Sequence, residues 1–134
     1  MTALVAVVVL VAASTALGLL WRSRQGRVRA AGGEAAEFVA AGARVTLLQL
    51  STEFCSPCRV AHTVLEAVAA ERADVAHVDL DITERPDVAS RFRVLSTPTT
   101  LVIDEHGAVR ARIAGAPRPT TVLDAIDSIR KAAA

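Results

Sequence analysis

The sequence predicts an α/β protein, with a central mixed sheet flanked by helices and one transmembrane helix at the N-terminus. Three observations lead to this fold class. An uncharged apolar stretch fills residues 3–20; apolar runs of strand length then alternate with amphipathic runs of helix length; and the last two of these strand-like runs are separated only by a short turn. A hydrophobic content of 52% fits one modest domain behind an apolar front segment.

The first 21 residues form the most apolar part of the chain. Residues 3–20 carry no charge and come near the lower length limit for a helix that spans a bilayer. A cleaved signal peptide is one alternative, although Met1 and Thr2 offer no basic side chain before the apolar run. A buried core helix is another, although a segment that is apolar all round fits poorly inside so small a domain. We therefore expect residues 1–21 to be a retained, single-pass anchor in the cell membrane.

Positive charge gathers directly after the apolar run. Four arginines lie within residues 22–33, which we expect to be a basic juxtamembrane linker. Positive charge marks the cytoplasmic flank of a membrane helix, so we expect the domain at residues 34–134 to lie in the cytoplasm. The lipid bilayer is the expected partner of these arginines. Nucleic acid is not an expected partner, because no basic patch with interleaved aromatic residues follows.

The first half of the domain predicts a β-α-β unit. Residues 34–41 indicate a short helix that ends at Gly42. Residues 45–50 are almost continuously apolar, as in a strand covered on both faces. Helical spacing of apolar residues over 59–72 predicts a helix, and alternation over 75–80 predicts a second strand. This order implies a parallel pair of strands with a right-handed crossover.

The second half of the domain predicts a helix, a hairpin and a final helix. Pro86 can begin a short helix over residues 86–93. Residues 99–103 and 108–114 are predicted strands, and the turn between them ends in glycine, which indicates an antiparallel hairpin. Residues 119–131 close the chain as an amphipathic helix.

The residues most informative about chemistry are Cys55-Ser56-Pro57-Cys58, which contain the only two cysteines of the chain. Two sulfurs at this spacing meet when the second lies in the first turn of a helix, so the pair can switch between dithiol and disulfide. A purely structural disulfide is a weak alternative, because so small a loop restrains the unfolded chain little. Haem attachment would need a histidine after Cys58, and Arg59 stands there.

A metal site is the sharper alternative for this pair. Cys55, Cys58 and His62 have the spacing C-x₂-C-x₃-H. A structural zinc ion would need a fourth ligand, for which only His77 and His106 remain among the histidines. We expect no metal, and no cofactor apart from the redox-active disulfide itself; His62 is then an exposed helix residue.

Together these motifs resemble the thioredoxin family. The cysteine pair follows the first predicted strand, Thr97-Pro98 precedes the third about 40 residues later, and Gly115 follows the last. The resemblance covers the whole domain and implies a thioredoxin-like fold, although the family's usual first strand is not recognisable. It also implies a cis peptide bond at Pro98, and a platform for the substrate backbone formed by Thr97 and Pro98.

The resemblance implies a thiol–disulfide oxidoreductase that reduces protein disulfides. Cys55 is the expected nucleophile, because backbone N–H groups and the helix dipole favour a thiolate at a helix start. Cys58, which lies one turn further and deeper, is expected to resolve the mixed disulfide. Pro57 suits the first turn, since it has no N–H group to leave unpaired. The expected partners are protein disulfides and an electron-donating reductase or membrane thiol protein.

Several positions depart from the family pattern, among them Ser51 and Ser56, and three others bear most on the mechanism and the partner. Gln49 stands where a buried aspartate assists proton transfer, and an amide does not titrate. His77 stands at the place of a partner lysine, so protons would move through water or through His77; a packed strand histidine is the alternative. Phe54 replaces a common tryptophan, which favours a dedicated membrane-linked partner over the usual reductase.

Two other functions stay open at this point. One is an extracytoplasmic thiol–disulfide protein for oxidative folding or cytochrome maturation, because such relatives also lack the aspartate. The other is a redox-inactive binding module, which would keep the fold and dock peptides on Thr97 and Pro98.

Overall fold

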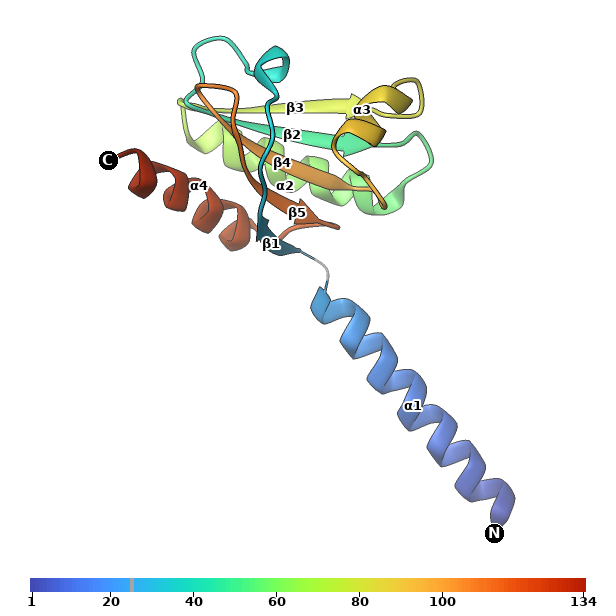
Figure 1. Ribbon diagram of the computed structural model, residues 1–134. Helices are drawn as coiled ribbons and strands as arrows, with labels where there is room; N and C mark the ends of the chain where they lie inside the picture. Colours follow the sequence, from blue (N-terminus) through green and yellow to red (C-terminus); the bar gives the residue numbers. More distant parts are fainter. Residues whose placement is uncertain (25) are drawn as a thin grey trace.

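The computed structural model describes residues 1–24 and 26–134. A long helix projects from one corner of a mixed five-stranded sheet, and helices cover both faces of that sheet (Figure 1). In chain order the elements are α1 (Thr2–Arg24), β1 (Arg27–Ala30), the 3₁₀ helix η1 (Ala36–Phe38), β2 (Val45–Ser51), α2 (Ser56–Glu71), β3 (Val75–Asp81), α3 (Pro86–Arg91), β4 (Thr99–Asp104), β5 (Val109–Ala114) and α4 (Pro119–Ala133).

The strands lie in the order β1-β5-β4-β2-β3. The β2 and β3 strands pair in parallel on either side of the α2 crossover, and β4 and β5 form the antiparallel hairpin; both pairings are as predicted. The β2 strand lies inside the sheet, between β4 and β3, and is buried along its whole length, which explains its continuous apolar run. The predicted mixed sheet flanked by helices is confirmed.

Two hydrophobic clusters hold the layers together, one on each face of the sheet. The first joins α2 and α4 to the sheet and includes Leu65 and Ile126, both fully buried. The second joins α3 and the η1 region to the other face and includes Val88 and Phe92. Fully burying one such side chain contributes roughly 1.5–3 kcal/mol. The two clusters therefore make the sheet a rigid support for the polar side chains at one of its ends.

The linker expected over residues 22–33 is wrong for its central part, because residues 27–30 form the edge strand β1. This strand pairs antiparallel with β5, with Arg27 opposite Ala114 and Arg29 opposite Arg112. All four of its residues are exposed, so the sequence shows none of the alternation that marks a half-buried strand. The β1 strand is therefore the first strand that could not be recognised from the sequence.

The helix expected over residues 34–41 is also wrong, because only Ala36–Phe38 form a 3₁₀ turn. Ala35 is fully buried, and its N–H group donates to the carbonyl of Gly107 at 2.7 Å. Gly107 has a φ of 84°, and a Cβ atom there would lie 2.6 Å from the Cα of Ala36. The hairpin turn thus packs directly on this segment, and tertiary contact overrides its local helical tendency.

The α1 helix is the one described helix long and apolar enough to cross a membrane. Its 23 residues extend about 34 Å, against a hydrocarbon core of about 30 Å. None of its residues is buried against the domain. The hydroxyls of Ser14 and Thr15 each donate to a carbonyl one turn earlier at 2.8 Å, so they need no water.

Candidate active site

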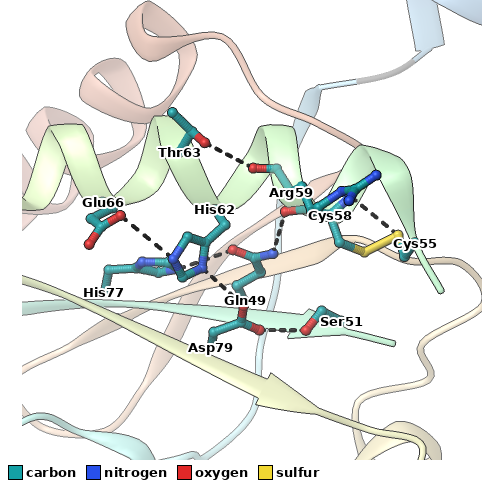
Figure 2. Close-up of polar contacts among 10 residues, drawn as sticks. All are labelled: Gln49, Ser51, Cys55, Cys58, Arg59, His62, Thr63, Glu66, His77 and Asp79. Atoms are coloured by element: carbon teal, nitrogen blue, oxygen red, sulfur yellow. Dashed lines mark hydrogen bonds and ion pairs between the residues drawn. A yellow bond between two sulfur atoms is a disulfide. The ribbon is translucent and has the colours of Figure 1, made fainter. Parts of the chain in front are cut away.

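The two cysteines lie where β2 gives way to α2. Cys55 is the N-cap of α2, Pro57 lies in its first turn, and Cys55 and Cys58 form a disulfide with their Cα atoms 5.2 Å apart (Figure 2). The backbone N–H of Cys58 points at Sγ of Cys55, at 3.2 Å. A sulfur atom therefore takes the place of the side-chain oxygen that commonly caps a helix.

The two cysteines differ in their access to solvent. Cys55 is partly exposed, whereas Cys58 is only 5% exposed. An incoming sulfur therefore reaches Cys55 first, and Cys58 lies behind it against the sheet.

Gln49 connects the disulfide to the next strand. Its side chain is fully buried; its amide nitrogen donates to the carbonyl of Cys58 at 2.9 Å, and its amide oxygen lies 3.0 Å from Nε2 of His77 (Figure 2). An amide oxygen only accepts, so Nε2 of His77 carries the proton. Burial, followed by the nearby charge of His62, lowers the pKa of His77. His77 is therefore a neutral donor held on Gln49.

A second polar chain runs beside the first and was missed by the sequence reasoning. The Ser51 hydroxyl donates to one carboxylate oxygen of Asp79 at 2.5 Å, and Nδ1 of His62 lies 3.0 Å from the other. The rings of His62 and His77 are edge to face, with centroids 4.9 Å apart. The available signal was the alternation of β3, which places His77 and Asp79 on the face toward α2, where His62 follows Cys58 by one turn.

A pocket of about 330 Å³ joins this second chain to the disulfide. Its lining includes both cysteines together with Ser51, His62 and Asp79. Solvent in this pocket therefore contacts both cysteines as well as the side chains of His62 and Asp79. Among the described residues, no titratable side chain of either polar chain forms a direct hydrogen bond to a sulfur atom.

The segment before β4 lies alongside the disulfide loop. The peptide bond between Thr97 and Pro98 is cis, as the resemblance implies. Thr99 pairs with Leu50, and the hydroxyls of Thr52 and Thr97 are 3.3 Å apart, so this segment adjoins the chain that leads into Cys55.

A glycine fixes the other side of that segment. Gly115 has a φ of 77°, and its N–H group donates to the carbonyl of Pro98 at 2.8 Å. The segment is therefore pinned from both β2 and the end of β5.

Two large apolar side chains are exposed in these loops. Phe54 precedes the first cysteine and is 94% exposed; Leu95 precedes the Thr97-Pro98 segment and is 97% exposed. The sequence reasoning named Phe54 but missed Leu95, whose neighbours give no pattern that marks it as exposed.

The ligands considered for zinc do not gather around the cysteines. His62 faces Asp79, His77 is bound to Gln49, and His106 lies next to Glu105 in the turn between β4 and β5. Among residues 1–24 and 26–134, no group of three or more His, Cys, Asp or Glu side chains is placed to hold a metal ion.

Comparison with known proteins gives a consistent family. The thioredoxin family profile matches residues 30–128. A thioredoxin from Mycolicibacterium smegmatis is 34% identical over 88 residues, covering 63% of this chain and 78% of the relative. Thioredoxin-2 from Saccharomyces cerevisiae is 31% identical over 90 residues, covering 67% of this chain and 85% of the relative.

Two solved structures extend the comparison. Chloroplastic thioredoxin z matches with a TM-score of 0.62 over 72% of this chain and 86% of its own, and its 22% identity supports the fold alone. A thioredoxin mutant from Halobacterium salinarum matches with a TM-score of 0.58 at 26% identity, over 64% of this chain and 74% of its own. The profile match begins after α1 and includes both cysteines. This chain therefore belongs to the thioredoxin family and is a thiol–disulfide oxidoreductase that reduces protein disulfides.

Proposed function

We propose that this protein is a membrane-anchored protein-disulfide reductase, with residues 1–21 in the bilayer and the thioredoxin domain in the cytoplasm. The observation that carries the proposal is the direct connection of an unburied apolar helix to a domain with an accessible disulfide. Arg22 and Arg24 in the last turn of α1 support the cytoplasmic orientation through the positive-inside rule.

In the reducing direction the protein begins as the dithiol. The Cys55 thiolate attacks one sulfur of the substrate disulfide; that S–S bond breaks, and the other substrate sulfur leaves as a thiolate that takes up a proton. The Cys58 thiol then loses its proton and attacks Sγ of Cys55, which releases the second substrate thiol and closes the Cys55–Cys58 disulfide. An external dithiol donor, either a reductase or a membrane thiol protein, returns two electrons to the pair.

The site gives each cysteine a different task. The N–H group of Cys58 at the start of α2 stabilises negative charge on Cys55, which is the accessible sulfur and hence the nucleophile. Cys58 is buried behind it, so it reacts with the mixed disulfide only after the substrate has bound.

Proton exchange with Cys58 needs a route, since Gln49 does not titrate. His77 is held on Gln49 and donates there, which supports the alternative of a packed strand histidine and leaves water as the route. We assign the route to water in the pocket between Cys58 and the His62–Asp79 pair, because these residues line the same space. His77 and Gln49 then position Cys58 by its carbonyl.

Substrate docking is assigned to the loops around Cys55. Thr97 and Pro98 adjoin the disulfide loop and offer backbone groups to an extended peptide. Phe54 and Leu95 add exposed apolar surface to those loops.

The experiment for the chemistry is insulin reduction by the full chain in detergent, with dithiothreitol as electron donor. Wild type is expected to reduce insulin well above background, and Cys55→Ser is expected to give background. The matched variant Cys58→Ser is expected to accumulate a mixed disulfide that runs as a larger species on a non-reducing gel. Equal rates for wild type and Cys55→Ser would refute the enzyme assignment.

The experiment for the anchor is separate. The chain is expected to stay in the membrane pellet after carbonate extraction, and a reporter fused after Ala134 that works only in the cytoplasm is expected to be active. A silent reporter with normal expression would instead favour the extracytoplasmic alternative, in oxidative folding or cytochrome maturation. Release into the supernatant as a shortened chain would identify α1 as a signal peptide.

A further inference from the structure

The disulfide lies at the end of the sheet to which α1 is attached. A single row of paired residues crosses the sheet at this end, running from Arg27 through Ala114, Thr99 and Leu50 to Leu80. The chain enters β1 at the first of these residues. It leaves β2 just after Leu50 toward the disulfide, and it enters β4 at Thr99 directly after the cis-proline. The catalytic end is thus the end nearest the membrane anchor (Figure 1).

The connection to the anchor is too short to let this end move far away. The α1 helix ends at Arg24 and β1 begins at Arg27. Three Cα–Cα steps span at most about 11 Å, whatever the conformation of the connection. An anchored α1 therefore keeps the row of residues, and the loops that leave it, close to the headgroup region.

A groove of about 560 Å³ opens at this same end, and five arginines line it. They come from α1, from β1, from β5 and from the segment after α3, and are Arg24, Arg27, Arg29, Arg93 and Arg112. Leu95, Ser96 and Thr99 complete much of the lining, and no carboxylate takes part. The groove therefore reaches the segment that carries the cis-proline.

The described residues supply no counter-charge to the arginines of the groove. None of the five arginines forms an ion pair with another described residue. Elsewhere in the domain, Arg72 pairs with Asp127 and Arg85 with Asp87, so carboxylates are available where the fold uses them. The groove differs in presenting only positive charge.

The strand register concentrates this charge. Arg29 lies directly opposite Arg112 on β5, and like charges in such a pair destabilise a sheet unless an anion lies between them. Arg112 is held in place, because its guanidinium donates to the carbonyls of Phe92 and Arg93. The fold thus positions Arg112 before any ligand is present.

We propose that this groove binds the phosphates of anionic phospholipid headgroups and so holds the disulfide end of the domain against the bilayer surface. The proposal rests on the membrane anchoring of the proposed function, and it names the surface on which the reductase works. Arginine matches phosphate with its fork of N–H donors, and the anchor brings the groove to a surface rich in phosphate. The substrates within reach are then disulfides of membrane proteins close to that surface.

The test uses the full chain in lipid nanodiscs with one tryptophan as a depth probe. Trp21→Phe removes the native tryptophan, and Leu95→Trp places a new one at a fully exposed position of the groove. Nanodiscs carry a nitroxide quencher on the headgroup, and contain either phosphatidylcholine alone or phosphatidylcholine with one third phosphatidylglycerol. Quenching is expected to be strong in the anionic discs, weak in the neutral discs, and relieved by high salt.

Substitutions of single arginines test whether the lipid-dependent quenching comes from the groove. Arg29→Gln and Arg93→Gln, each added to the probe variant, are expected to weaken the docked state about fivefold per arginine. Arg44→Gln is the matched control, because it removes the same charge at the opposite end of the sheet, near Glu105, and it is expected to change nothing. Unchanged thermal unfolding of each variant excludes misfolding as the cause.

The outcomes separate this proposal from the proposed function. Equal quenching in both lipids, or equal losses for Arg93→Gln and Arg44→Gln, would overturn the headgroup assignment. Binding of inorganic phosphate in detergent with no dependence on anionic lipid would instead identify a soluble anion as the ligand. Insulin reduction in detergent is expected to be unaffected by Arg29→Gln, whereas loss of that activity would assign Arg29 to the reaction with the substrate and count against the headgroup role. A chain that does not enter nanodiscs would count against the anchor.

Discussion

Gln49→Leu is expected to destabilise the domain while leaving the pH dependence of reduction in place. The leucine keeps most of the volume but removes both side-chain hydrogen bonds of Gln49, at 2.9 Å to the Cys58 carbonyl and 3.0 Å to His77. The carbonyl keeps the main-chain partner that a helix supplies, so the main loss is the partner of the half-buried His77 ring. The expected cost is about 1–3 kcal/mol, or roughly 4–20 °C in the melting temperature.

Thr100→Val is the matched control for this change. Thr100 lies directly opposite Gln49 on β4, and its buried hydroxyl has no partner among the described residues. Replacing an unpaired buried hydroxyl by a methyl group is expected to be neutral or to stabilise the fold by up to about 1 kcal/mol. Gln49→Leu and Thr100→Val change the two members of one buried cross-strand pair, and they are thus expected to change the stability of the fold in opposite directions.

The assay is urea unfolding of the full chain in detergent, followed by circular dichroism, together with insulin reduction measured as a function of pH. Gln49→Leu should lower the unfolding midpoint, because its partners lose hydrogen bonds, and it should leave the inflections of the pH–rate profile unchanged, because an amide does not titrate. An unchanged midpoint combined with a shifted pH profile would refute the reasoning, since it would assign Gln49 to proton transfer instead of to the support of Cys58.

Three further predictions follow from the same contacts. Asp79→Asn is expected to shift the pH–rate profile of the second step, in which Cys58 must lose its proton, and to change the unfolding midpoint little; an unshifted profile would count against the pocket route. Burial lowers the pKa of His77 below the ordinary value of 6.5, so on acidification the unfolded chain binds the proton at a higher pH than the folded chain does. The free energy of unfolding should therefore fall as the pH drops below 6.5. His77→Gln should flatten this part of the curve of urea stability against pH, and an unaltered slope would contradict the assignment to His77. Gly107→Ala is expected to cost about 2–4 kcal/mol of unfolding free energy, because the new Cβ meets Ala36 at 2.6 Å with φ at 84°; a melting temperature within a degree of wild type would show that the turn relaxes freely.

The disulfide was predictable from the sequence because its determinants are local. A strand, two cysteines three positions apart and a helix with proline in its first turn all lie within residues 45–72. The cis bond before Pro98 came from the resemblance, since nothing in its own neighbourhood demands it. The hairpin at the end of the sheet was likewise readable from its short turn.

The surroundings of the disulfide were less predictable, because they depend on contacts between distant segments. Asp79 meets His62 only because β3 lies in parallel next to β2, under α2. The β1 strand is exposed along its length and becomes a strand only by pairing with β5, more than 80 residues later. The segment before β2 lost its expected helix because the turn at Gly107 packs against it.

The sequence by itself determined the chemistry of this protein and the character of its N-terminus: a CxxC redox pair, a family resemblance that the comparisons confirm, and an apolar N-terminal segment followed by arginines. Only the tertiary structure decided how these parts face one another. Antiparallel pairing of β1 with β5 brings the end of α1, the disulfide and the Thr97-Pro98 segment to one end of the sheet, and gathers five arginines there. The reason is that strand pairing joins residues far apart in the chain and fixes which residues lie side by side at one end of the sheet. Local sequence patterns do not specify that register.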